Sequence, residues 1–361
     1  MNKWMQGLEI LNRLHKHSYE AYFVGGAVRD YLQNVPVSDI DIITNALPED
    51  IAKLFSDVTM EGEKYYSCRI HWQGYTYEVT TFRKDVFYQD HRHPVTEVAS
   101  TLQEDLKRRD FTINAIAMDK NQKIIDVYHG KQDIENKIIR TIGEPRVRFD
   151  EDGLRVLRAL DFASRWNYVL DTEILHSFNQ DFLCSLKEEY IISMIKKIAD
   201  NPFDNGIKYI VDYQLLKSFP FYQVVIEEAY KYQYTKHIFA LFYVLHHFLP
   251  ANSKLTKKEV QVAKDIAFWI EYQFSSIALY YGNKDVLVDA VELYNAVYKK
   301  KIKEESILKQ IQELPIHSPK DIHLNWEEYP SSLRSMITRK LEKAILLNQV
   351  KNEEDALKKY L

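Results

Sequence analysis

Two short segments near the N-terminus constrain the fold more than any other feature of this 361-residue chain. In AYFVGGAVRDYL, an aromatic and β-branched run stops at Gly25 and Gly26, and a helical pattern follows from about Ala27. In DIDIIT, Asp and Ile alternate with the period of a strand, which places Asp39 and Asp41 on one face. Together the segments predict a strand, a glycine turn, a helix and a second strand.

The neighbouring segments extend this pattern to about residue 140. A helix is expected over residues 4–17, and LPEDIAKLF has Pro48 and acidic residues where a helix begins. TYEVTTF and KIIDVYH are typical of further strands in the same sheet. From Glu151 onward the apolar spacing is almost entirely helical, with breaks at proline-containing segments. A mixed α/β head followed by a long helical portion is therefore expected.

Charge and cysteine content limit the functional classes. The net charge is −4, so a polyanionic partner would have to bind a local basic patch. Cys68 and Cys184 are far apart in sequence and have no metal-ligand spacing, which argues against a disulfide framework or a zinc site. The first residues lack the apolar stretch of a signal peptide, and no segment has the apolar length to span a bilayer. A cytoplasmic protein without membrane attachment is expected.

The double glycine and the alternating aspartates suit phosphoryl transfer. Adjacent glycines allow backbone N–H groups to approach a phosphate at a helix N-terminus. Asp39 and Asp41 on one side of a strand would hold one or two Mg²⁺ ions. The alternative, a solvated edge strand, does not account for the apolar residues at 40 and 42 or for the upstream turn. The pattern predicts attack of an RNA 3′-hydroxyl on a nucleoside triphosphate without a covalent enzyme intermediate.

Several longer motifs occur together and in register. They are FVGGAVRDYL, SDIDIITNALPEDI, YEVTTFR, EDLKRRDFTINAIAMD, IIDVYHGKQDI and FDEDGLRVLRAL. In order and spacing the chain resembles the class II tRNA nucleotidyltransferases, the bacterial family of CCA-adding enzymes and poly(A) polymerases. The resemblance is dense over residues 20–165 and faint beyond. It implies an α+β protein, with a polymerase-β-like nucleotidyltransferase head of mixed sheet and helices followed by an all-α neck, body and tail.

The resemblance also implies a division of the chain and roles for single residues. The head would span residues 1–140, the helical neck 141–200, and the tRNA-binding body and tail 201–361. Asp39 and Asp41 would be the catalytic metal ligands. The nucleotide-binding residues would be Gly26, Arg29, Arg109, Asp152, Arg155 and Arg158. For Arg29, an ion pair with the neighbouring Asp30 is the alternative interpretation.

Asp152, Arg155 and Arg158 are three residues apart, so they are predicted to share one helix face. A carboxylate accepts from the exocyclic amine of cytosine or adenine, and a guanidinium donates to the adjacent ring nitrogen or carbonyl. Guanine and uracil would place a carbonyl against the carboxylate, so the set favours C and A without a nucleic-acid template. The alternative is an exposed ladder of ion pairs, which contributes only tenths of a kcal/mol.

Residues 86–98 follow neither the helical nor the strand period and are predicted to form a loop. In the family, a flexible loop here permits the change from C to A addition, and Asp90 and Arg92 match its core motif. Enzymes that add only CC have a shortened loop, so its full length favours CCA or A addition. Two positions depart from the family pattern: Asp161 and Tyr190 stand where arginines are usual.

The function implied by the resemblance is template-independent addition and repair of the 3′-terminal CCA of tRNA. CTP and ATP would be the substrates, Mg²⁺ the cofactor and tRNA the partner, with no obligatory protein partner inferred. One alternative is an A-adding specialist that works with a separate CC-adding enzyme. Another is a catalytically silent RNA-binding relative, against which the two intact aspartates argue. A poly(A) polymerase would usually have a longer, more basic C-terminal region than one ending in EEDALKKYL.

Overall fold

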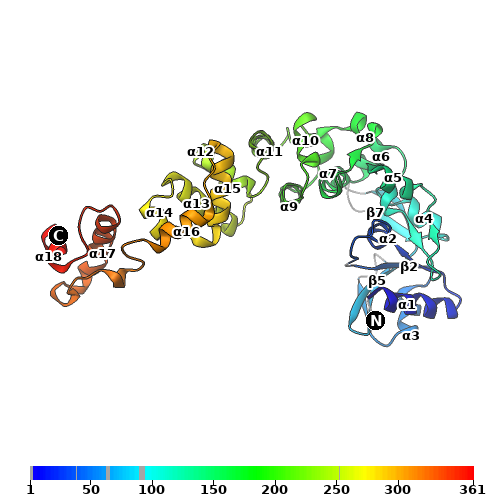
Figure 1. The fold of residues 1–361 in the computed structure, drawn as a ribbon. Helices are drawn as coiled ribbons and strands as arrows, with labels where there is room; N and C mark the ends of the chain where they lie inside the picture. The colour runs from blue at the N-terminus through cyan, green and yellow to red at the C-terminus, as the bar shows by residue number, and fades with distance from the viewer. Residues whose placement is uncertain (1–2, 38, 62–65, 89–93, 252) are drawn as a thin grey trace. The chain divides into compact units, whose positions relative to one another are not determined.

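The computed structural model describes residues 3–37, 39–61, 66–88, 94–251 and 253–361. The chain forms two compact units, residues 1–223 and 224–361 (Figure 1). The expected functional divisions at residues 140 and 200 remain predictions. No helix among the described residues is both long and apolar enough to cross a membrane.

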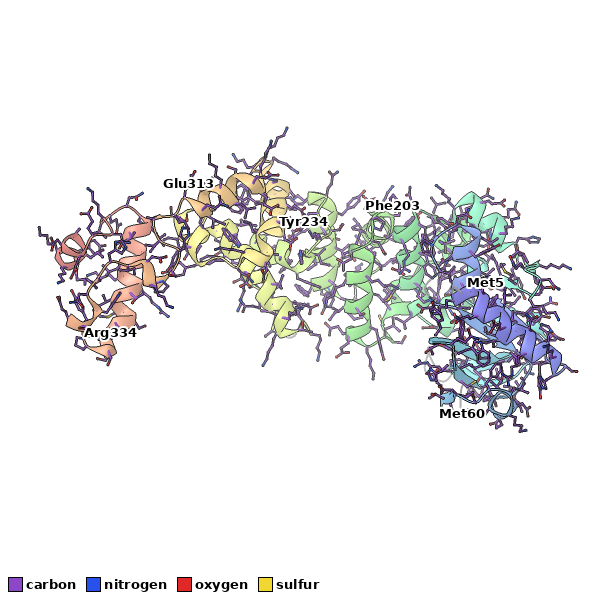
Figure 2. All side chains as sticks on the ribbon, turned by 60° about the horizontal axis from the view of Figure 1, so that its bottom comes forward. Met5, Met60, Phe203, Tyr234, Glu313 and Arg334 are labelled. Atoms are coloured by element: carbon purple, nitrogen blue, oxygen red, sulfur yellow. The ribbon has the colours of Figure 1, made fainter. Side chains whose placement is uncertain are left out.

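The first unit is built on a seven-stranded mixed sheet with the order β3-β4-β5-β2-β1-β8-β9. The strands are β1 Ala21–Val24, β2 Asp41–Thr44, β3 Val58–Glu61, β4 Ser67–Trp72, β5 Tyr75–Thr81, β8 Ala117–Met118 and β9 Ile124–Ile125. Strand β2 is central, antiparallel to β1 and parallel to β5. Ile42 and Ile43 point to opposite faces and both are buried, so both faces of β2 are covered. The edge strand β3 carries the exposed Met60 (Figure 2).

Short helices and a hairpin surround this sheet (Figure 1). The helices are α1 Lys3–Lys16, α2 Gly26–Leu32, α3 Pro48–Leu54, α4 Leu102–Lys107 and α5 Gly130–Asn136. Helix α1 packs closely on the sheet, because Gly7 lies against the rings of Phe23 and Tyr77. The hairpin consists of β6 Arg83–Tyr88 and β7 Pro94–Val98.

The remainder of the first unit is mainly helical. It contains α6 Pro145–Glu151, α7 Leu154–Trp166, α8 Thr172–Ser177, α9 Glu188–Ala199 and α10 Asn205–Asp212, with the 3₁₀ helices η2 Thr112–Asn114 and η3 Gln180–Leu183. Helix α7 packs against α9 and α10. Two short strands pair in parallel, β10 Ile138–Ile139 and β11 Val169–Leu170. Their hydrogen bonds connect the chain before α6 with the chain after α7.

The second unit is helical throughout its described residues. Helix α11, Pro220–Tyr232, begins before the division at residue 223. It is followed by α12 Ile238–His246, α13 Lys257–Glu271, α14 Ser276–Tyr281, α15 Leu287–Tyr298, α16 Glu304–Gln312, α17 Ser331–Leu346 and α18 Glu354–Tyr360, with η4 Lys284–Val286, η5 Pro319–Asp321 and η6 Trp326–Glu328 between them. Trp269 of α13 is fully buried, and Leu341 of α17 packs with Leu357 of α18 in a C-terminal core.

The predicted α+β class is confirmed, and four local predictions need correction. Residues 86–98, predicted to form a loop, instead include the end of β6 and all of β7, because these segments pair with each other, which no local period reports. Strand β2 begins at Asp41, so Asp39 precedes the strand. Its partner β1 ends at Val24, where Gly25 turns the chain away, so the register between the two strands ends at the pair Val24 and Asp41. KIIDVYH contributes only the two residues of β9. The segment expected to be all-helical also contains β11.

Candidate active site

A pocket of about 500 Å³ opens in the first unit between the central strands, the β6–β7 hairpin and helix α7. Most of the predicted site residues line it: Gly26, Arg29, Asp41, Arg109, Asp152, Arg155 and Arg158. Asp39 is not among the lining residues. Asp90 and Arg92 lie outside the described residues. The structure thus brings residues more than a hundred positions apart in sequence into one site.

The glycine turn has a backbone shape that requires glycine. Gly25 has φ = 69° and ψ = −132°, in a region that L side chains rarely adopt. A β-carbon there would lie 3.1 Å from Nη1 of Arg109 and 4.0 Å from Oδ2 of Asp41. The turn therefore lets both functional side chains approach the start of α2, and Gly26 is the first residue of that helix.

The carboxylates gather where β2 begins. Asp41 is in register with Glu78 of β5, a residue that the sequence analysis did not select. Burial raises the pKa of Asp41, and the charge of Asp39 adds to this rise while Arg109 opposes it. Burial and the charge of Asp41 likewise raise the pKa of Glu78. The side chain of Asp39 is 90% exposed and its Oδ1 lies 3.7 Å from Nζ of Lys3.

This carboxylate region is compatible with a divalent cation that retains water. Among the described residues, no three or more His, Cys, Asp or Glu side chains converge closely enough to hold a metal by themselves. Mg²⁺ is usually held by one or two carboxylates, with waters and substrate phosphates completing its shell. Asp41 and Asp39 supply oxygen ligands of the correct type, and Asp41 lines the pocket.

Arg29 is held rigidly at the pocket wall. Its Nη1 donates to Oδ1 of Asn114 at 2.6 Å, and its Nε donates to Oδ1 of Asp30 at 2.9 Å. The guanidinium stacks over the ring of Trp166, 4.1 Å from the ring centroid. The predicted alternative of an Arg29–Asp30 pair is therefore present, and it coexists with a position at the pocket surface.

Arg109 and Arg158 are positioned by buried aspartates. Nη2 of Arg109 contacts Oδ2 of the fully buried Asp105 at 3.2 Å. Nη2 of Arg158 contacts Oδ2 of Asp110 at 2.6 Å, and Asp110 in turn accepts from Nδ2 of Asn114. Because Asn114 also accepts from Arg29, these contacts link Arg29 to Arg158 through Asn114 and Asp110.

The predicted single helix face of Asp152, Arg155 and Arg158 is wrong in one respect. Asp152 precedes α7 as the C-cap of α6, and its Oδ1 accepts from the backbone N of Leu154. The extended backbone of Asp152 separates the two helices, and the next residue must be glycine because a β-carbon at Gly153 would lie 2.0 Å from the carbonyl oxygen of Phe182. Arg155 and Arg158 are on α7 as expected, and all three side chains line the pocket.

The two departures from the family pattern lie elsewhere. Asp161 is buried inside the first unit, where it contacts Arg165 and Lys197 at 3.0 Å each and accepts from Nδ2 of Asn201 at 2.9 Å. It does not line the pocket and is not paired with Arg158. Tyr190, near the start of α9, is 38% exposed.

Glu78, Asn114 and Tyr88 are pocket residues that sequence reasoning missed. Glu78 belongs to the strand segment YEVTTF, but its position opposite Asp41 depends on the parallel register of β2 and β5. That register is a long-range property that no local pattern reports. Asn114 lies within the motif that supplied Arg109, so the motif itself was a usable signal.

Comparison with known proteins agrees with this geometry. Residues 21–140 match the Poly A polymerase head domain family. A CCA-adding enzyme of Bacillus licheniformis is 32% identical over 99% of this chain and 98% of its own, and one of Anoxybacillus flavithermus is 34% identical over 99% and 96%. The crystal structure of the Bacillus stearothermophilus CCA-adding enzyme in complex with CTP matches with a TM-score of 0.75 and 27% identity, covering 98% of this chain and 95% of that one. The chain belongs to the family of CCA-adding enzymes.

Proposed function

We propose that this chain adds and repairs the 3′-terminal CCA of tRNA, with CTP and ATP as substrates. The observation that carries the proposal is one pocket in which Asp41 and Arg109 lie with Asp152, Arg155 and Arg158. Arg109 suits the phosphates of a nucleotide, Asp41 suits a divalent cation bound to those phosphates, and the other three suit the base. The similarity to CCA-adding enzymes over almost the whole chain supports the same reaction.

In the proposed reaction, the terminal 3′-hydroxyl oxygen of the RNA forms a bond to the α-phosphorus of the nucleoside triphosphate. The bond from that phosphorus to the bridging oxygen breaks, and pyrophosphate leaves. Arg29 and Arg109 would bind the triphosphate by charge-assisted hydrogen bonds. Their contacts with Asp30, Asn114 and Asp105 fix both guanidinium groups before the nucleotide arrives.

The nucleotidyltransferase family suggests dependence on a divalent metal. We propose Mg²⁺ as the metal and Asp39 and Asp41 as its ligands, with Glu78 as a nearby third carboxylate. When bound, two such ions would activate the attacking hydroxyl and neutralise the charge on the departing pyrophosphate. Asp39 lies outside the strand and is highly exposed, so Asp41 provides the fixed side of this site.

Base selection is assigned to Asp152, Arg155 and Arg158. The acceptor oxygens of Asp152 suit the exocyclic amines of cytosine and adenine, and the arginines donate to the adjacent acceptors. The tRNA would lie along the helical body and tail. There the exposed cations Lys299, Lys300, Lys301, Lys303, Arg339 and Lys340 are candidate phosphate contacts. The cytoplasmic location expected from the sequence remains a prediction.

An A-adding specialist is the second candidate. A loss of positive charge at position 161 would favour it if that side chain lined the pocket, but Asp161 is buried against α9 and does not line the pocket. The presence of Asp161 therefore does not favour an enzyme that adds only A. A catalytically silent relative would not need Asp41 beside the glycine turn, where the structure places it.

The discriminating experiment uses the full chain, Mg²⁺ and tRNA transcripts that end at the discriminator base, at C or at CC. CTP and ATP are supplied singly and together. We expect C, C and A to be added in order to the shortest transcript, and A alone to the transcript ending in CC. Extension of only the CC-ending transcript would establish the A-adding alternative. No extension of any transcript would remove the enzymatic proposal.

A further inference from the structure

Arg155 is anchored from two sides. Its Nη1 donates to the backbone oxygen of Arg148 at 2.9 Å and to Oε2 of Glu151 at 2.5 Å. Both of these partners lie on α6, just before Arg155 in sequence. Its Nη2 donates to the hydroxyl of Tyr88 at 2.6 Å, and Tyr88 is the last residue of strand β6. The second anchor therefore reaches α7 from the β6–β7 hairpin.

The hydroxyl of Tyr88 has a defined direction. It donates its single proton to Oδ2 of Asp85 at 2.7 Å, so its oxygen is the acceptor for Arg155. Burial raises the pKa of Tyr88, which keeps the hydroxyl protonated at neutral pH. The Tyr88 ring also faces the Arg155 guanidinium, with its centroid 5.4 Å from Cζ. The order of donation is thus Arg155 to Tyr88 to Asp85.

These contacts leave only some N–H groups of the Arg155 guanidinium available to a ligand. A guanidinium has five N–H groups in one plane, and three of those of Arg155 are used by Arg148, Glu151 and Tyr88. Toward the described residues, its Nε–H and second Nη2–H make no further hydrogen bond. Two anchors on different nitrogens fix the plane of the group. Without the Tyr88 hydroxyl, only Nη1 would be held, and the free N–H groups would lose their fixed direction.

We propose that Tyr88 is a positioning residue that sets base selectivity by fixing the guanidinium of Arg155. The inference rests on the proposed function, in which Arg155 reads the base edge. Asp85, Tyr88, Asp152 and Arg155 all line the same pocket, so these hydrogen bonds and the carboxylate assigned to the exocyclic amine belong to one site. Tyr88 itself acts through Arg155 and makes no base contact in this assignment.

The test is Tyr88→Phe in the full chain, which keeps the ring and removes the hydroxyl. Values of kcat/KM for CTP, ATP, UTP and GTP are measured on tRNA transcripts, with tRNA affinity and thermal stability measured in parallel. We expect discrimination against UTP and GTP to fall on the order of tenfold, as for loss of a hydrogen bond to a charged group. We expect tRNA affinity to be unchanged. Tyr75→Phe, which changes a partly exposed tyrosine of β5, is the matched control and should retain full discrimination.

A double-mutant cycle separates positioning from general packing. Arg155→Ala should relax discrimination more than Tyr88→Phe, and the double variant should be no worse than Arg155→Ala alone. If the two losses instead add, Tyr88 does not act through Arg155 and the inference is overturned. If Arg155→Ala relaxes discrimination but Tyr88→Phe does not, the positioning role alone is overturned. Unchanged selectivity in Arg155→Ala would remove the reading role of Arg155 in the proposed function, and the role of Tyr88 with it.

Discussion

At the scale of single residues, the buried carboxylate of Asp105 and the half-buried carboxylate of Asp41 have pKa values shifted in opposite directions. Burial raises the pKa of both, but for Asp105 the Arg109 and Arg108 charges and several hydrogen bonds outweigh it and lower the pKa overall. For Asp41 the charges of Arg109 and Lys3 do not outweigh burial, and its pKa stays raised. Asp105 is therefore a structural anchor for arginines, whereas Asp41 has no such pair of arginine contacts.

Removing Asp41 should separate catalysis from RNA binding. We expect Asp41→Ala to lower incorporation by at least about a thousandfold, because a metal site supplies several kcal/mol of transition-state stabilisation. Its affinity for tRNA should change little. Incorporation of labelled ATP and filter binding of tRNA measure the two effects, with the exposed Asp57→Ala as control. Near-normal turnover of Asp41→Ala would contradict the metal-site assignment.

Asp105 predicts a dependence of stability on pH. Its folded-state pKa lies below the unfolded value of about 3.9, so it stabilises the fold above that pH and this contribution is lost as the pH falls below it. Asp105→Asn should lower the free energy of unfolding by about 3 kcal/mol near neutral pH, because the arginines lose a buried partner. Urea unfolding across this pH range should show a smaller acid-induced loss for the variant. Parallel pH profiles for both proteins would disprove this assignment.

At the scale of elements, helix α7 has two faces with different tasks. Arg155 and Arg158 face the pocket, while Asp161 faces Lys197 of α9. A helix turns by about 100° per residue, so Asp161, six residues after Arg155, points roughly 120° away from it. The departure at Asp161 is accordingly a packing feature of the first unit.

Asp161→Ala should affect stability and leave base selection intact. We expect the free energy of unfolding to fall by about 1–2 kcal/mol, because Lys197 and Arg165 are partly exposed and regain water. Thermal unfolding and the CTP-to-UTP incorporation ratio provide the measurements. The exposed Asp212→Ala in α10 is the control for removing a negative charge. If Asp161→Ala changes the CTP-to-UTP incorporation ratio but leaves stability unchanged, Asp161 has a role in nucleotide selection and the packing assignment is wrong.

At the scale of the whole molecule, a net charge of −4 must coexist with the proposed binding of a polyanion. The cations proposed to contact tRNA are concentrated in segments of the second unit, such as Lys299, Lys300 and Lys301. Binding through such local patches releases counterions from the RNA and therefore depends on salt.

We expect tRNA affinity to fall about a hundredfold between about 50 and 200 mM salt, as for roughly four to five phosphate contacts. Replacing Lys299, Lys300 and Lys301 together by alanine should lower both the affinity and its salt slope. Filter binding over a salt series measures both quantities. Replacing Lys120, Lys123 and Lys131 of the first unit provides a charge-matched control. If the control variant lowers tRNA affinity and its salt slope equally, the effect comes from net charge and Lys299, Lys300 and Lys301 are not a specific contact.

Much of the architecture was predictable from sequence because its signals are local. The run ending at Gly25, the helix start at Pro48 and the helical spacing after Glu151 depend on backbone preferences within a few residues. The motifs also identified Arg29, Arg109, Arg155 and Arg158, which all line the pocket. Family membership followed from the same motifs.

Only the tertiary structure decided how these residues meet. The parallel register of β2 and β5 places Glu78 beside Asp41, and the packing of the β6–β7 hairpin on α7 places Tyr88 against Arg155. The close approach of Phe182 makes Gly153 necessary, and Asp152 lies between α6 and α7 with an extended backbone. Each of these contacts joins segments far apart along the chain, and their pairing depends on the packing of the complete unit, which local residue preferences do not specify.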